Sequence, residues 1–157
     1  MTIRPATPRD LEAVKSLLTE VNRVHWEGRP DLFRLCRKYT DEEILAIFAD
    51  PLTPVLIAAD DQDEALGYAF CVLQDHTKDH HMMPIKTLYI DDLCVFERTR
   101  GQGVGRALYD AALDLARSLG CHNLTLNVWA LNDGALAFYE KCGMHVQKYG
   151  METILNP

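Results

Sequence analysis

The spacing of apolar positions predicts two amphipathic helices in the first third of the chain. Apolar residues recur every three or four positions from 11 to 21, behind a helix start formed by Thr7, Pro8 and Asp10. A second capping pattern at 40–43 precedes the apolar residues of 44–48. The stretch 25–39 is broken by glycine and proline, and its apolar residues at 32–35 predict a short additional helix.

Alternating and β-branched runs predict the strands of one sheet. We expect strands at 2–5 (an edge strand), 55–59, 65–73, 88–95, 123–129 and, as one or two strands, 144–155. The second and third form an antiparallel hairpin, and helices are predicted at 104–119 and 132–142, each ending before a glycine. This order predicts a single domain over residues 1–157, of mixed α/β class with helices on both sheet faces. The strands joined through the helix 104–119 should be parallel.

A glycine-rich loop lies between the strand 88–95 and the helix 104–119. The run from Arg100 to Arg106 holds three glycines in five residues. Glycines before a helix N-terminus let an anion approach the backbone, where free N–H groups and the helix dipole bind it. The loop has neither the Lys-Ser/Thr ending of a P-loop nor the G-x-G-x-x-G spacing of a dinucleotide site. It therefore predicts another kind of phosphate site, with an ordinary glycine-rich turn as the alternative.

Composition narrows the class of protein. A hydrophobic content of 48% with 25% charged residues is typical of a soluble globular domain. A net charge of −7 argues against nucleic-acid binding, and no apolar run is long enough to span a membrane or form a signal core. Five cysteines without C-x-x-C spacing indicate reduced thiols, so we expect a cytoplasmic protein. The spacing of His76, His80 and His81 is not that of a zinc site, and we expect no metal.

Two motifs carry a resemblance to a known family. Arg100, Gly103 and Gly105 form an Arg-x-x-Gly-x-Gly pattern that resembles the pyrophosphate loop of the GNAT superfamily of acyl-CoA N-acyltransferases. The run 132–144, NDGALAFYEKCGM, resembles a second signature of that superfamily at the expected distance. The resemblance implies the GNAT fold: a central mixed, mostly antiparallel sheet with helices on both faces and a splayed parallel strand pair. Because dimers are common in this fold, it also favours a homodimer.

The resemblance implies where acetyl-CoA, as cosubstrate, binds. The strand holding Leu93 and Val95 would splay from the strand holding Asn127, and pantetheine would pair with the backbone of the first. The Leu93 amide would face the thioester carbonyl and stabilise the oxyanion. Asn132 would cap its helix and bond pantetheine. Arg100 would add charge or pin the loop, and the pyrophosphate would be held by backbone amides of Gly101, Gln102, Gly103, Val104, Gly105 and Arg106.

The resemblance also suggests the catalytic groups. Tyr139 would protonate the departing CoA thiolate, unless it is a tyrosine packed in the core. A general base is needed because an alkylamine is mostly protonated near neutral pH. Asp91 and Asp92 resemble the acidic pair of diamine acetyltransferases, and strand alternation predicts that they point to opposite faces. We favour Asp91, which has the parity of Leu93 and Val95; alternatively, the aspartates only bind a cation or cap a bulge.

The resulting hypothesis is an N-acetyltransferase that moves an acetyl group from acetyl-CoA to a primary amine by direct attack in a ternary complex. A small-molecule amine or polyamine is the favoured acceptor, with a protein lysine or N-terminus as alternatives. Ribosomal-protein alanine acetyltransferases carry Glu where this chain has Asn127, which weakens the N-terminal alternative. A non-catalytic acyl-CoA-binding regulatory module is a further alternative. By analogy, the acceptor pocket would include Glu20, His25, Trp26, Glu27 and Arg29.

Overall fold

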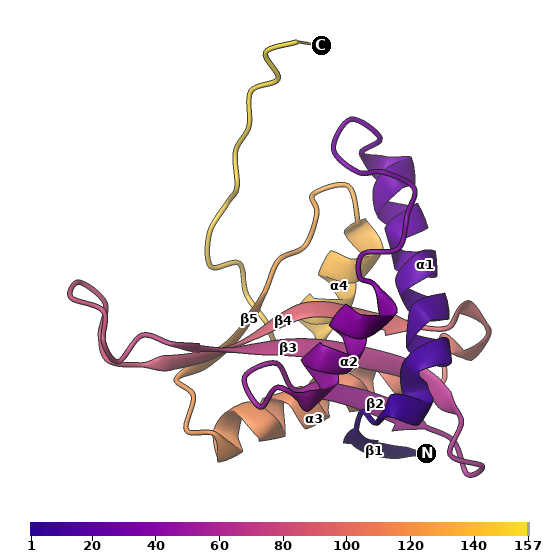
Figure 1. Cartoon of the computed structure of the whole chain (residues 1–157). Helices are drawn as coiled ribbons and strands as arrows, with labels where there is room; N and C mark the ends of the chain where they lie inside the picture. The colour runs from indigo at the N-terminus through magenta and orange to yellow at the C-terminus, as the bar shows by residue number, and fades with distance from the viewer. Residues whose placement is uncertain (157) are drawn as a thin grey trace. The chain divides into compact units, whose positions relative to one another are not determined.

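The computed structural model describes residues 1–156 (Figure 1). The chain divides into two compact units. The first unit runs from Met1 to Asn127 and holds the whole sheet, while the second begins at Val128. Each unit is described by itself below. Within residues 1–156, no helix is long and apolar enough to cross a membrane.

The sheet of the first unit has five strands in the order β1-β2-β3-β4-β5, with β1 at one edge. All neighbours are antiparallel except β4 and β5, which are parallel, so the predicted mixed and mostly antiparallel sheet is confirmed. Figure 1 shows the long strands β3 and β4 running side by side through its centre. The bounds are β1 Thr2–Pro5, β2 Val55–Ala59, β3 Ala65–Asp75, β4 Lys86–Val95 and β5 Asn123–Leu126.

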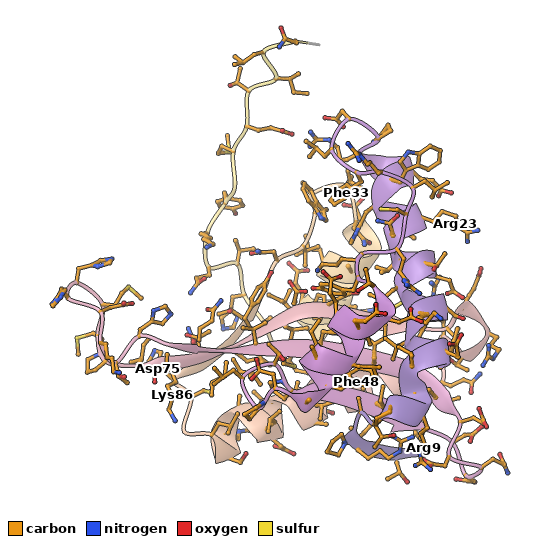
Figure 2. All side chains as sticks on the ribbon, in the orientation of Figure 1. Arg9, Arg23, Phe33, Phe48, Asp75 and Lys86 are labelled. Carbon is orange, nitrogen blue, oxygen red and sulfur yellow. The ribbon has the colours of Figure 1, made fainter. Side chains whose placement is uncertain are left out.

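Helices cover both faces of this sheet. One core contains the buried residues of α1 (Leu11–Gly28) and α2 (Asp41–Ala49) together with Tyr68, Phe70 and Cys94 from the sheet. Figure 2 shows Phe48 of α2 over this face, where its ring lies 6.4 Å from that of Phe70. The opposite face is covered by α3 (Val104–Ser118), whose buried residues are Val104, Leu108, Tyr109, Ala112 and Ala116.

The helix starts follow the predicted capping chemistry. The short turn η1 (Pro8–Asp10) precedes α1, and Asp10 accepts hydrogen bonds from the Thr7 N–H and hydroxyl at 2.7 and 3.0 Å. At α2 the Thr40 hydroxyl accepts from the Glu43 N–H, and the Glu43 carboxylate accepts from the Thr40 N–H. The second box thereby satisfies the Glu43 N–H, which the first helical turn leaves unpaired.

The predicted short helix at 32–35 is wrong. The helix α1 continues to Gly28, and residues 29–40 then form turns and bends without a helix. Leu32 and Leu35 are 53% and 61% exposed, so they supply no buried face against which a helix could pack. Side-chain bonds order the segment instead; for example, Asn22 Oδ1 accepts from the Cys36 N–H at 3.0 Å.

The second unit contains α4 (Asp133–Lys141). Asn132 Oδ1 accepts from the Ala135 N–H at 3.1 Å, which confirms Asn132 as the N-cap, and the helix ends before Gly143 at φ +94°. The predicted strands at 144–155 are wrong, because residues 144–156 form no regular element. The apolar side chains from Val146 onward are exposed, with Tyr149 at 82% and Met151 at 91%, so alternation here reflects no buried face. Likewise, β5 ends at Leu126 and does not reach residue 129.

Candidate active site

A β-bulge interrupts the pairing of β3 with β4. Phe70 lies opposite Asp92 and the next residue, Cys71, lies opposite Ile90, so Asp91 is an extra residue in β4. An extra residue bends its strand and changes where the neighbouring side chains point. The bulge therefore falls on the aspartate pair that the sequence singles out.

The pairing of the parallel strands ends at Ile90, because β5 ends at Leu126. The β4–β5 ladder runs from the pair Thr87–Asn123 to the pair Ile90–Leu126 and stops there. The remaining five residues of β4 therefore have no strand of the first unit on their β5 side. The predicted parallel pair is confirmed, and its ladder ends halfway along β4.

Backbone groups of Leu93 and Val95 point toward this unpaired side. The Phe96 N–H donates to the Leu66 carbonyl at 3.1 Å. Phe96 and Leu66 are therefore a hydrogen-bonded pair of the antiparallel ladder. Such pairs alternate with pairs whose N–H and C=O groups point away from each other. By this alternation Cys94 and Asp92 bond to β3, while Leu93 and Val95 direct their N–H and C=O groups to the side where β5 has ended. The Leu93 N–H also donates to the Asp92 carboxylate, which lowers the Asp92 pKa.

The glycine loop has the backbone shape that an anion site needs. Gly101 and Gly103 have φ of +75° and +80°, a region that favours glycine, and no heavy atom lies within 4 Å of a Cβ built on either. The Ala107 N–H donates to the Gly103 carbonyl at 3.0 Å. The preceding N–H groups of Val104 and Gly105 lie in the first turn, where a helix supplies no acceptor for them. They are therefore placed to bind an anion.

The glycine loop is anchored to the sheet by a residue that the sequence did not indicate. The short turn η2 (Glu97–Thr99) follows β4, and Thr99 is 7% exposed. Its hydroxyl lies 2.9 Å from the Phe96 carbonyl and 3.2 Å from the Leu66 carbonyl. In the sequence, a threonine after an apolar strand gives little indication of such an anchor, because many threonines follow strands without bonding to two of them.

Asp92 lies in a low-polarity environment. Its Oδ2 accepts a hydrogen bond from the buried Tyr68 hydroxyl at 2.5 Å. Burial raises the pKa of Asp92 to about 6, and the Tyr68 hydrogen bond opposes this rise because it favours the ionised carboxylate. At neutral pH the group is ionised yet close to its pKa, which suits a proton acceptor.

Asp91 is held in an ion pair. Lys38 Nζ lies 2.7 Å from Asp91 Oδ2, and the Tyr39 hydroxyl donates to the same oxygen at 3.3 Å. Burial lowers the pKa of Lys38, but the Asp91 carboxylate outweighs burial and leaves the pKa raised. Lys38 is therefore a cation at neutral pH, and its ammonium occupies the Asp91 carboxylate.

The prediction that the two aspartates point to opposite faces is wrong. Asp92 meets Tyr68, and Asp91 meets Tyr39, whose ring stacks on Phe70 at 6.1 Å. Both Tyr68 and Phe70 belong to the core under α1 and α2, so both carboxylates reach groups on that side of the sheet. The bulge breaks the alternation on which the prediction depended. It also removes the parity argument that joined Asp91 to Leu93 and Val95.

Two other side chains of the first unit, Cys94 and His25, have surroundings that suit a structural role. Burial raises the pKa of the Cys94 thiol to about 12, helped by the carboxylates of Asp92 and Glu20, so Cys94 is not a nucleophile. His25 stacks on Phe33 at 5.2 Å, and burial, followed by the charge of Lys38, lowers its pKa. Within residues 1–156, no three His, Cys, Asp or Glu side chains are grouped to hold a metal ion.

The second unit carries Tyr139 on α4. Its ring meets that of Phe138 edge-on at a centroid distance of 5.0 Å, and its side chain is partly buried. The Met144 N–H donates to the Tyr139 carbonyl at 3.1 Å, which closes the end of the helix. The catalytic role suggested for Tyr139 and the pantetheine contact suggested for Asn132 stay predictions.

Comparison with known proteins defines the class. The sequence profile of the acetyltransferase (GNAT) family matches residues 18–144 of this chain. The chain belongs to this family, whose members are acyl-CoA-dependent N-acetyltransferases.

Individual relatives agree with the family but differ in the acceptor that their names state. The peptidyl-lysine N-acetyltransferase YjaB of Salmonella typhimurium is 34% identical over 105 residues, which cover 67% of this chain and 59% of the relative. The N-alpha-acetyltransferase 30 of Schizosaccharomyces pombe is 30% identical over 83 residues, which cover 53% of this chain and 52% of the relative. The chain thus spans little more than half the length of these curated relatives.

A solved structure is similar over the whole chain. A mutant of the BH1408 protein from Bacillus halodurans is 34% identical and superimposes with a TM-score of 0.94, covering 99% of this chain and all of that one. The expected GNAT fold is therefore confirmed.

Proposed function

We propose that this protein transfers an acetyl group from acetyl-CoA to a primary amine by direct attack, without a covalent acetyl-enzyme. One observation carries the proposal: the bulge that holds Asp91 and Asp92 stands where β4 parts from β5. Carboxylates, outward backbone amides and an anion-binding loop are thereby joined on one continuous stretch, residues 91–106.

The cosubstrate would bind along this stretch. Backbone groups of Leu93 and Val95 would pair with the amides of pantetheine, and the pyrophosphate would lie on the amides between residues 102 and 106. Gly101 and Gly103 fit this role because the space beside each is open. The exposed Arg100 would add a positive charge next to the phosphates.

Transfer requires the acceptor to lose a proton and the carbonyl oxygen to gain stabilisation. The structure favours Asp92 over Asp91 as the base, because Asp91 is neutralised by Lys38 whereas Asp92 has its pKa raised to about 6. The Leu93 N–H would donate to the oxyanion of the tetrahedral intermediate. The C–S bond then breaks, and Tyr139 would protonate the departing thiolate.

The charge around the bulge supports a cationic acceptor. The carboxylates of Asp92 and Glu20 act on Cys94 and that of Asp91 pairs with Lys38, so these three acidic groups exceed the two nearby cations, Lys38 and Arg100, by one charge. A small-molecule amine or polyamine fits this surrounding best. The relatives named for peptidyl-lysine and for N-alpha-acetylation make a protein lysine or N-terminus the second candidate.

The test is CoA thiol release from acetyl-CoA with polyamines, aminoglycosides, amino acids and short peptides as acceptors. Release with one class, above the rate without protein, is expected and would identify the acceptor. Calorimetric titration with acetyl-CoA runs in parallel. Tight binding of acetyl-CoA with no release from any acceptor would contradict the catalytic proposal and favour a regulatory acyl-CoA-binding module.

A further inference from the structure

Lys38 presents an alkylammonium to the carboxylate of the β4 bulge. We propose that Lys38 is itself an acceptor, so that the protein acetylates its own Lys38 within one chain. This inference rests on the proposed acetyl transfer and extends it by naming a modification site.

The position of the amine is the first support. Lys38 Nζ lies 2.7 Å from Asp91 Oδ2, although the two residues are 53 positions apart in the sequence. Asp91 directly follows Ile90, the last β4 residue paired with β5, and Leu93 is two residues further on. Two residues of extended chain span roughly 7 Å, so the ammonium lies at the edge of the backbone that would hold the thioester.

The surroundings of the amine are the second support. Lys38 lies in the segment 29–40 between α1 and α2, which forms no regular element. Its side chain is 45% exposed, and Nζ lies 5.1 Å from the centre of the Tyr39 ring. The ammonium is therefore partly enclosed by protein but still open to a bound reactant.

The reaction balances with acetyl-CoA as the only co-reactant. The Lys38 ammonium gives one proton to Asp91, and the neutral amine attacks the thioester carbonyl carbon. The C–N bond forms, the C–S bond breaks, and the CoA sulfur leaves as a thiolate that takes up a proton. The products are Nζ-acetyl-Lys38 and CoA thiol, with one proton released to solvent.

Acetylation would change the acceptor site. The acetylated side chain carries no charge, so it can no longer pair with Asp91. The carboxylate is then free to bind the ammonium of a second, external amine. The first turnover would thus prepare the site for later ones.

The chain offers a matched control in Lys15. Its Nζ is paired with Glu12 at 2.9 Å and with Asp41 at 3.1 Å, and its side chain is 23% exposed. Both lysines are therefore ion-paired, but Lys15 contacts no residue of the bulge. The exposed residues Lys78, Lys141 and Lys148 give the rate of uncatalysed acetylation. That rate is higher for exposed lysines than for ion-paired ones, because ion pairing favours the protonated amine.

The experiment incubates the full chain with acetyl-CoA and follows acetylation of each lysine by peptide mass spectrometry. Lys38 is expected to react at least about tenfold faster than Lys15, because it is held beside the reactant. The first-order rate should not change with protein concentration, and Asp91→Asn should lower it while circular dichroism shows an intact fold. Lys38→Arg should show no gain of acetyl at this position.

Three results would overturn the proposal. Equal rates for Lys38 and Lys15 would indicate uncatalysed chemistry, and a rate that rises with protein concentration would indicate transfer between chains. External amines acetylated while Lys38 stays unmodified would reject self-acetylation and leave the proposed function standing. If neither Lys38 nor any amine of the panel is acetylated, both proposals fail together.

Discussion

The hydroxyl of Tyr68 on β3 donates a hydrogen bond of 2.5 Å to Oδ2 of Asp92 on β4. The bond joins a fully buried ring to a carboxylate at the point where the two strands lose their regular register. Because the donor favours the ionised form, Tyr68 limits how far burial can raise the Asp92 pKa.

Tyr68→Phe should therefore raise the Asp92 pKa further. If Asp92 is the base, the acid limb of kcat/KM against pH should move to higher pH, and the rate well above the limb should change little. The measurement is a pH–rate profile of wild type and variant with the same acceptor. A limb that stays in place or moves down would remove Tyr68 and Asp92 from the proton path.

Substitution of each aspartate should separate their roles. Asp92→Asn removes the proton acceptor and should lower kcat about 10²–10⁴-fold, the usual contribution of a general base. Asp91→Asn should mainly raise the KM of a cationic acceptor, because acetylation of Lys38 frees the Asp91 carboxylate to bind the acceptor ammonium. Steady-state kinetics on both variants measures these two effects. A large loss of kcat in Asp91→Asn, with mainly a KM effect in Asp92→Asn, would assign the base to Asp91.

Asp92→Asn should also stabilise the fold at neutral pH. A carboxyl whose pKa is raised on folding, here from 3.8 to about 6, binds protons more tightly when folded, so its contribution to stability falls as pH rises from 4 to 6. Asparagine keeps an acceptor for Tyr68 without the buried charge. Urea unfolding should show a gain of up to about 3 kcal/mol at pH 7.5.

The same gain should vanish near pH 4, where Asp92 is protonated in both states. Groups that titrate equally in the variant and in wild type cancel in the difference between their free energies of unfolding at each pH. Among these is Asp10, whose pKa burial raises but the hydrogen bond from Arg4 brings below its usual value. A difference that does not depend on pH would show that Asp92 is not the titrating group.

Gly103→Ala tests the anion loop. Alanine at φ +80° costs about 1–2 kcal/mol of stability, and its methyl group would stand where the pyrophosphate approaches. We expect acetyl-CoA affinity to fall about tenfold or more, measured by calorimetry. Gly120→Ala is the matched control: it lies beyond the other end of α3 at φ +67° with equally open space.

The control should lose similar stability and keep its affinity for acetyl-CoA. Equal affinity losses in the two glycine variants would mean that strain, and not the position in the loop, weakens binding. Unchanged affinity in both would place the phosphates elsewhere.

Tyr139→Phe should lower kcat and leave the acetyl-CoA Kd nearly unchanged, because only the departing thiolate needs the phenol proton. Tyr149→Phe, in the same unit and 82% exposed, should change neither quantity. Stopped-flow turnover and calorimetry give the two values. An unaltered kcat in the first variant would exclude Tyr139 as the acid.

The sequence predicted those parts of the fold that depend on local pattern. Capping at Thr40, the helical spacing before Ser118 and the glycines at 101 and 103 act over a few residues, so their signals are complete in the sequence. The same holds for the strand 55–59 and its hairpin partner.

The features that were missed depend on contacts between distant segments. The bulge at Asp91 is a mismatch between two strands, and neither strand shows it alone. Lys38 is placed at the site by its ion pair with Asp91, which is 53 positions away in the sequence. Local alternation also misleads where no partner strand is formed, as for the apolar residues at 146–155, which are exposed.

The end of the β4–β5 ladder at Ile90 and Leu126 also affects how freely this region can vary in evolution. If backbone groups bind the cosubstrate, the side chains at 93 and 95 are selected for packing against their neighbours and not for binding acetyl-CoA. Only proline, which lacks the N–H, is barred from these positions by the ligand itself. Acceptor preference can then diverge through the side chains near the bulge while the acetyl donor stays the same.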